Sequence, residues 1–289
     1  MRILVTGVKG QLGFDICEEL SKRGYSDFRG IDIADLDITD EEAVNKYILE
    51  YKPDVVMHNA AWTAVDKAEE NYELVYRVNA LGPKFIADAC KKIDAKMVYI
   101  STDYVFDGTK NGIYEVDDKP NPVSTYGSTK LDGEKFVKEI LDKYFIVRIS
   151  WVFGKNGNNF IKTMLKLASM GKNELDVVND QVGSPTYTKD LAILLCDMIE
   201  TDKYGIYHAT NEGFCSWYEF AQKVFEVSSI DMKVNPIHTK DYLLKVSQQA
   251  KRPMNSKMSK DSLTKAGFKH LPSWEDALER YLKELKDNG

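Results

Sequence analysis

The chain has 289 residues, 43% of them hydrophobic and 29% charged, with a formal net charge of −6. This is the composition of a soluble globular protein with room for one large domain or two modest ones, and its acidic balance argues against nucleic acid as the main partner. No apolar run reaches the ~20 residues that span a bilayer, so we expect no membrane partner and a cytoplasmic location. The scattered cysteines and histidines predict reduced thiols and no metal site.

Short apolar runs alternate with amphipathic stretches in the first half of the chain. A glycine turn and a first helical pattern through Ile16, Leu20 and Arg23 follow the first run. The predicted strands are residues 3–5, 28–33, 54–58, 97–101 and 145–149, and the other predicted helices are residues 41–51, 72–90 and 126–141. Strands that are apolar throughout and separated by helices indicate a parallel sheet covered on both faces. We therefore predict an α/β fold with a Rossmann-type doubly wound parallel sheet.

The pattern becomes less regular after residue 150. Helices are expected at residues 159–170, 190–199, 216–227 and 273–285. We expect a dinucleotide-binding domain over residues 1–150, with a return segment at about 187–203. Residues 151–186 and 204–289 would then form a smaller mixed α/β substrate-binding domain.

Three spaced glycines follow the first predicted strand and open the first predicted helix. Gly7, Gly10 and Gly13 would let the backbone turn tightly, approach a pyrophosphate and pack the helix on the sheet. The helix N-terminus would present free N–H groups to that pyrophosphate. The plainer interpretation is a turn that tolerates glycine, but the strand–turn–helix context favours a dinucleotide cofactor.

An acidic residue ends the second predicted strand. Asp32 lies roughly 20 residues beyond the glycine turn, where a carboxylate can accept hydrogen bonds from the adenosine ribose. It would repel a 2′-phosphate, which favours NADH slightly over NADPH, although Lys9 and Arg29 are near enough to weaken that argument. The less favoured alternative for Asp32 is a strand-end carboxylate in a turn. Asp37 and Ile38 are candidates for contact with the adenine, or simply part of the loop before the next helix.

Tyr126 and Lys130 stand four residues apart, on one face of a predicted helix. A lysine ammonium near a phenol favours the phenolate, so we expect the pKa of Tyr126 to fall from its usual value of about 10. Such a phenol can give a proton to a carbonyl oxygen. Thr102, at the end of a predicted strand, would supply a second hydrogen bond to that oxygen, and Ser101 competes for this role.

With these motifs the chain resembles the extended short-chain dehydrogenases/reductases, and among them most closely the dTDP-4-dehydrorhamnose reductases. The most specific matching stretches are residues 60–69, 101–108, 150–153, 158–160 and 179–186. The resemblance implies reduction of the 4-keto group of dTDP-4-dehydro-L-rhamnose to dTDP-L-rhamnose with NADH or NADPH. It also implies, by analogy, a homodimer.

The resemblance makes Tyr126 the proton donor, Lys130 its electrostatic partner and ribose anchor, and Thr102 a hydrogen-bond donor to the keto oxygen. Asp103 and Trp151 would meet the sugar, although Trp151 could instead fill the core. Arg252 could hold the nucleotide diphosphate, or belong to a solvated basic patch. The cofactor-binding residues implied by the motif and the family are Gly7, Gly10, Gln11, Leu12, Gly13, Asp32, Asp37, Ile38, Ala60, Ala61, Trp62, Thr63, Tyr126 and Lys130.

Two other functions fit the same scaffold. A nucleotide-sugar dehydratase or epimerase is one, but dehydration requires a second carboxylate after Asp103, where this chain has Tyr104. The other is a regulatory protein that binds NAD(P) without catalysis, as a regulatory subunit of methionine adenosyltransferase does. Intact Thr102, Tyr126 and Lys130 argue against the regulatory alternative.

Overall fold

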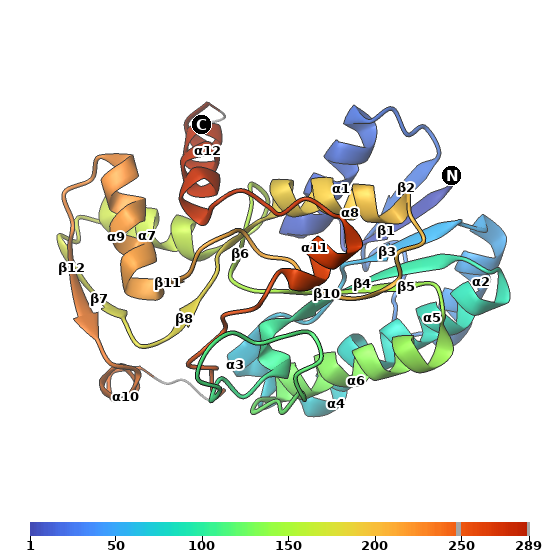
Figure 1. Ribbon diagram of the computed structural model, residues 1–289, viewed down its shortest axis with the longest axis horizontal. Helices are drawn as coiled ribbons and strands as arrows, with labels where there is room; N and C mark the ends of the chain where they lie inside the picture. The colour runs from blue at the N-terminus through green and yellow to red at the C-terminus, as the bar shows by residue number, and fades with distance from the viewer. Residues whose placement is uncertain (247–249, 288–289) are drawn as a thin grey trace.

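Six parallel strands form the central sheet of the protein, whose computed structural model describes residues 1–246 and 250–287. The strands lie in the order β10-β5-β4-β3-β1-β2 (Figure 1). Their bounds are β1 Ile3–Thr6, β2 Phe28–Ile31, β3 Val55–His58, β4 Lys96–Thr102, β5 Tyr144–Ile149 and β10 Gly205–His208. The strand order reverses direction between β1 and β3, which opens a crevice at their carboxyl ends. The predicted Rossmann-type sheet is confirmed.

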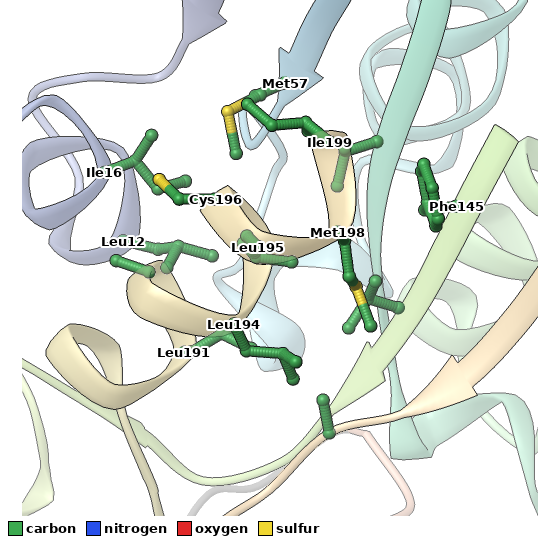
Figure 2. Packing of buried hydrophobic residues seen from close by; sticks show 14 of the residues in the cluster. Leu12, Ile16, Met57, Phe145, Leu191, Leu194, Leu195, Cys196, Met198 and Ile199 are labelled. Carbon is green, nitrogen blue, oxygen red and sulfur yellow. The ribbon is translucent and has the colours of Figure 1, made fainter. Parts of the chain in front are cut away.

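Helices cover both faces of this sheet, as its strands, apolar on both faces, require. Helices α1 (Gln11–Lys22) and α8 (Thr188–Ile199) cover one face, and α2 (Glu41–Tyr51), α5 (Gly82–Lys92) and α6 (Thr125–Ile140) cover the other (Figure 1). Figure 2 shows Leu191, Leu195 and Cys196 of α8 beside Leu12 and Ile16 of α1 in one apolar cluster. The predicted helix at residues 190–199 therefore returns to the sheet.

A second, smaller core lies beside the sheet. It packs α7 (Phe160–Ser169), α9 (Trp217–Ser228) and α12 (Trp274–Asp287) against short two-stranded pairings. These pairings are β6 (Val152–Phe153) with β9 (Thr186–Tyr187), β7 (Glu174–Val178) with β12 (Lys233–Ile237), and β8 (Val182–Gly183) with β11 (Cys215–Ser216). Aromatic rings dominate this core, and Figure 1 shows these helices beside the sheet. The mixed α/β character expected for this part is confirmed.

Strand β10 extends the returning segment beyond the expected residues 187–203. It pairs with β5 from Gly205 to His208, inside the stretch assigned to the second domain. The division into domains stays a prediction. By its pairing, strand β10 belongs with the central sheet. Among the described residues, no helix is both long and apolar enough to cross a membrane.

The single helix predicted at residues 72–90 is wrong in its middle. The structure has α4 (Tyr72–Tyr76), a π-helical turn at Arg77–Leu81 and then α5. Pro83 has no N–H to give to the carbonyl of Asn79 four residues earlier. The hydroxyl of Tyr99 donates to that carbonyl instead, at 3.2 Å. The interruption turns the Asn79 side chain toward the site described below.

We expect Asp15→Asn to stabilise the protein at pH 8. Burial raises the pKa of Asp15 to about 6, from its usual value of 3.8, although Thr188 donates a hydrogen bond to its carboxylate. Ionisation therefore penalises the folded state as pH rises from 3.8 to about 6, by at most about 3 kcal/mol. Urea unfolding should show a larger gain at pH 8 than at pH 5. Glu50→Gln, exposed on α2, is the control, and an equal gain at both pH values would contradict the assignment.

Candidate active site

A cavity of about 770 Å³ opens at the carboxyl ends of the sheet strands. Of the residues predicted for the site, all but Arg252 line it. They are Gly7, Gly10, Gln11, Leu12, Gly13, Asp32, Asp37, Ile38, Ala60, Ala61, Trp62, Thr63, Thr102, Asp103, Tyr126, Lys130 and Trp151. Arg252 lines an adjoining cavity of about 290 Å³, which shares Asp103, Tyr104 and Trp151 with the larger one. The structure thus brings motifs from the whole first half of the chain to one crevice.

The glycine turn leaves no room for side chains. Gly7 has φ +70°, and a Cβ there would lie 2.9 Å from the backbone nitrogen of Ala60. A Cβ on Gly13 would lie 2.3 Å from the carbonyl oxygen of Gly7, so this residue lets α1 pack directly on the turn. Gly10 is the N-cap of α1 and has no side chain to occupy the first N–H groups of the helix. These features fit a dinucleotide pyrophosphate.

Asp32 lines the cavity beside the glycine turn. Its carboxylate accepts the backbone N–H groups of Lys9 and Ile33, both at 2.9 Å. The Arg29 guanidinium stacks 4.2 Å from the centre of the Tyr51 ring and is occupied there. Lys9 is therefore the cation beside Asp32 in the cavity lining. Strand β2 ends before Asp32, at Ile31, two residues earlier than expected, because Asp32 begins a turn with Asp35.

The loop that follows β3 is held by a residue that the sequence analysis missed. Asn79, in the π-helical turn, accepts from the Trp62 backbone N–H at 2.8 Å and donates to the Trp62 carbonyl at 3.1 Å. This pairing places the loop of Ala60, Ala61 and Trp62 along the cavity wall. A π-helical turn often marks a functional site, but only the fold reveals one here.

A loop from the second core lies over the glycine turn, and its role was also missed. The Asn156 amide donates to the Lys9 carbonyl at 2.8 Å, and the Asn159 amide donates to Oε1 of Gln11 at 3.0 Å. Gly157 and Asn158, between them, line the large cavity. The matching stretch at residues 158–160 was the only signal in the sequence. The contacts tie the turn to the second core.

Thr102 and Asp103 form a hydrogen-bonded unit at the end of β4. The Thr102 hydroxyl donates to Oδ1 of Asp103 at 3.0 Å, and the Ser256 hydroxyl donates to Oδ2 at 2.5 Å. Burial raises the pKa of Asp103 to about 6. The neighbouring Ser101 hydroxyl donates to Glu134 at 2.5 Å and is occupied there. Of these two hydroxyls, Thr102 is the one that acts on Tyr126, whose pKa it lowers.

The direction expected for the pKa of Tyr126 is wrong. Burial raises the pKa of Tyr126 above its usual value, and the hydrogen bond with Thr102 only partly opposes this. Burial also lowers the pKa of Lys130 to about 7, so its charge is itself costly here. A raised pKa keeps the phenol protonated. That is the form needed to give a proton to a ketone.

Trp151 adopts an unusual backbone conformation at the end of β5. Its φ is +49°, in the left-handed region that bulky residues rarely occupy. The ring stacks on Trp217 with centroids 3.7 Å apart, and a Cβ on Gly183 would lie 2.9 Å from the Trp151 ring itself. Stacking and the missing Cβ together hold the strained residue. Trp151 lines both cavities, so it does more than fill the core.

Arg252 is paired within the protein. Its guanidinium donates to Asp66 at 2.7 Å and to the Tyr104 hydroxyl at 3.1 Å. The Tyr104 ring meets the Tyr126 ring edge-on, with centroids 5.4 Å apart. Arg252 is thus connected to Tyr126 through the side chain of Tyr104. It does not belong to the solvated basic patch considered above.

The model of one protein family, the RmlD substrate binding domain, matches residues 1–287. The chain belongs to this family. A spore coat polysaccharide biosynthesis protein, SpsK of Bacillus subtilis (strain 168), is 39% identical over 283 residues, covering 98% of this chain and 97% of that protein. A dTDP-4-dehydrorhamnose reductase of Aggregatibacter actinomycetemcomitans is 39% identical over 290 residues, covering 96% and 97%.

Solved structures of RmlD family members superpose closely on the chain. A dTDP-4-dehydrorhamnose reductase of Clostridium acetobutylicum has a TM-score of 0.95 at 45% identity, covering 99% of this chain and 100% of that one. The enzyme of Bacillus anthracis, in complex with NADP, has a TM-score of 0.93 at 43% identity, covering 98% and 99%. The likeness includes both cores.

We expect Gly13→Ala to weaken cofactor binding by at least about tenfold, or ~1.4 kcal/mol. The added Cβ would meet the Gly7 carbonyl oxygen at 2.3 Å, and backbone has to move to relieve it. Titration calorimetry with NADH measures the loss. Glu18→Ala, exposed on the same helix, is the control. Equal affinities of Gly13→Ala and the unaltered chain would show that the turn does not bind the cofactor.

Proposed function

We propose that this protein is an NAD(P)H-dependent reductase that converts the 4-keto group of dTDP-4-dehydro-L-rhamnose to the alcohol of dTDP-L-rhamnose. The carrying observation is that Thr102, Tyr126 and Lys130 line one cavity with the glycine turn. The relatives with that reductase name cover nearly the whole chain and support the choice of substrate. The homodimer and the cytoplasmic location stay predictions.

The residues of the chain provide the proton and the electrostatics of the reduction. A bound nicotinamide cofactor supplies the hydride that reduces the keto carbon. Tyr126 gives its phenolic proton to the keto oxygen, on which negative charge develops. Thr102 turns its hydroxyl proton from Asp103 to the same oxygen, and the Lys130 ammonium stabilises the phenolate left on Tyr126. The neutral phenol that burial enforces is the reactant in this direction.

The adjoining cavity supports a nucleotide-linked sugar as the substrate. Trp151 separates it from the large cavity, and Phe160 and Trp217 add aromatic surface for a base or sugar. Arg252 supplies positive charge at the same wall, although it must share its guanidinium with Asp66. We assign Asp103 and Trp151 to the sugar and Arg252 to the diphosphate.

A dehydratase or epimerase activity finds no support at the end of β4. The residue after Asp103 is Tyr104, whose hydroxyl accepts from Arg252 and cannot serve as a second carboxylate. A regulatory NAD(P)-binding protein has no need of a proton donor in the cavity. Tyr126, Thr102 and Lys130 form a complete set for ketone reduction, which favours the enzyme.

Tyr126→Phe should lower kcat about 10²- to 10⁴-fold, because the general acid is removed. NADH binding should persist, because the ring and the glycine turn remain. The assay follows the decay of absorbance at 340 nm with dTDP-4-dehydro-L-rhamnose. Tyr144→Phe, at the first residue of β5, is the control. Turnover retained in Tyr126→Phe would refute its role. Cofactor binding without turnover in the unaltered chain would favour the regulatory alternative.

For the cofactor we propose a modest preference for NADH, set by Asp32. The carboxylate would lie against a 2′-phosphate, and Arg29 is engaged with Tyr51. The Bacillus anthracis relative was solved with NADP, so Lys9 is the residue to weigh against Asp32. Asp32→Asn should shift the ratio of kcat/KM values toward NADPH by about tenfold. An unchanged ratio would show that Asp32 does not discriminate.

A further inference from the structure

Glu134 is a buried anion behind the site that the mechanism above does not use. It is 4% exposed and stands four residues after Lys130 on α6, so the two side chains share one face of the helix. Its carboxylate accepts from Ser101 of β4 at 2.5 Å. It also accepts from Nε and Nη2 of Arg148 of β5, at 2.9 and 2.7 Å. Two strands and a helix therefore fix this carboxylate.

The other groups around Lys130 do little to stabilise the buried charge of its ammonium. Its Nζ lies 4.1 Å from the centre of the Tyr99 ring, on β4. Tyr99 stacks with His58 of β3, which stays neutral because burial lowers its pKa to about 3. Tyr126, on the same helix, is a neutral phenol with a raised pKa. Burial alone would drive Lys130 toward its neutral form, and Glu134 opposes that shift of its pKa.

The Arg148 guanidinium also contacts groups beyond Glu134. It donates to the Val116 carbonyl, at 3.2 Å, and lies 5.1 Å from the centre of the Phe106 ring. Neither is a contact of Lys130. Asp103, a buried carboxylate of the cavity lining, is bound by Thr102 and Ser256. Arg148 therefore holds the Glu134 carboxylate in place on the helix face that it shares with Lys130.

We propose that Glu134 is a positioning residue whose buried carboxylate, held by Arg148 and Ser101, keeps the Lys130 ammonium charged during ketone reduction. The inference rests on the proposed reductase function. Reduction needs Lys130 protonated, because its charge stabilises the phenolate left on Tyr126. Activity should therefore fall as pH rises through the pKa of Lys130, and any loss of the Glu134 charge should move that fall to lower pH.

The test compares pH profiles of kcat/KM for two substitutions at one position. Glu134→Gln keeps the shape and removes the charge, so the alkaline limb should move down by about one pH unit. Glu134→Asp keeps the charge and disturbs the packing, so its limb should stay near the original position. An unmoved limb in Glu134→Gln, or equal shifts in both variants, would overturn the proposal. Should Glu134→Gln unfold, the double variant with Arg148→Met leaves no buried charge unpaired, and its alkaline limb should still lie below that of the unaltered chain.

A direct titration separates this inference from the proposed function. Protein carrying ¹³C at the lysine ε-carbons reports the ionisation of Lys130 by NMR, with its signal assigned through Lys130→Met. Glu134→Gln should lower that midpoint whether or not the chain turns over a sugar. An unchanged midpoint would refute the role of Glu134. A lowered midpoint in a chain without reductase activity would refute the reductase and leave the electrostatic coupling standing.

Discussion

The construction of the site follows from burying the amine of Lys130. An ammonium removed from water is stable only if nearby groups replace its hydration. The protein supplies the face of the Tyr99 ring and a carboxylate one helical turn away. Tyr99 in turn donates to the carbonyls of Asn79 and Lys130, which joins the π-helical turn to α6. The groups around the buried Lys130 charge therefore link α6, β4 and the π-helical turn that carries Asn79.

The same helix–strand junction explains two glycines and a proline. Gly133 lies so close to Tyr99 that a Cβ would stand 2.3 Å from the hydroxyl. Gly127 lies equally close to the Tyr104 carbonyl, where a Cβ would stand 2.2 Å away. Both allow α6 to approach the sheet and bring Tyr126 and Lys130 to the cavity. Pro83 frees the carbonyl of Asn79 for Tyr99, so α5 is adapted to the same contact.

The sequence predicts the sheet well because parallel strands covered on both faces appear as continuous apolar runs. It predicts the glycine turn and the Tyr126–Lys130 pair because their geometry is local. Other features depend on distant partners. The pairing of Arg252 with Asp66 joins residues 186 apart in the chain. The direction of the Tyr126 pKa depends on burial, which no spacing along a helix reveals. The role of Asn79 depends on Pro83, Tyr99 and Trp62 meeting in space.

The two cores meet at residues that are held in place by partners from both of them. Trp151 accepts a left-handed backbone because Trp217 and Gly183, both outside the sheet, hold its ring. Asn159 caps α7 and also bonds Gln11 of the cofactor helix and the Tyr281 hydroxyl of α12. These contacts link residues of one core to residues of the other. The crevice between them is therefore bounded by residues that contact both cores.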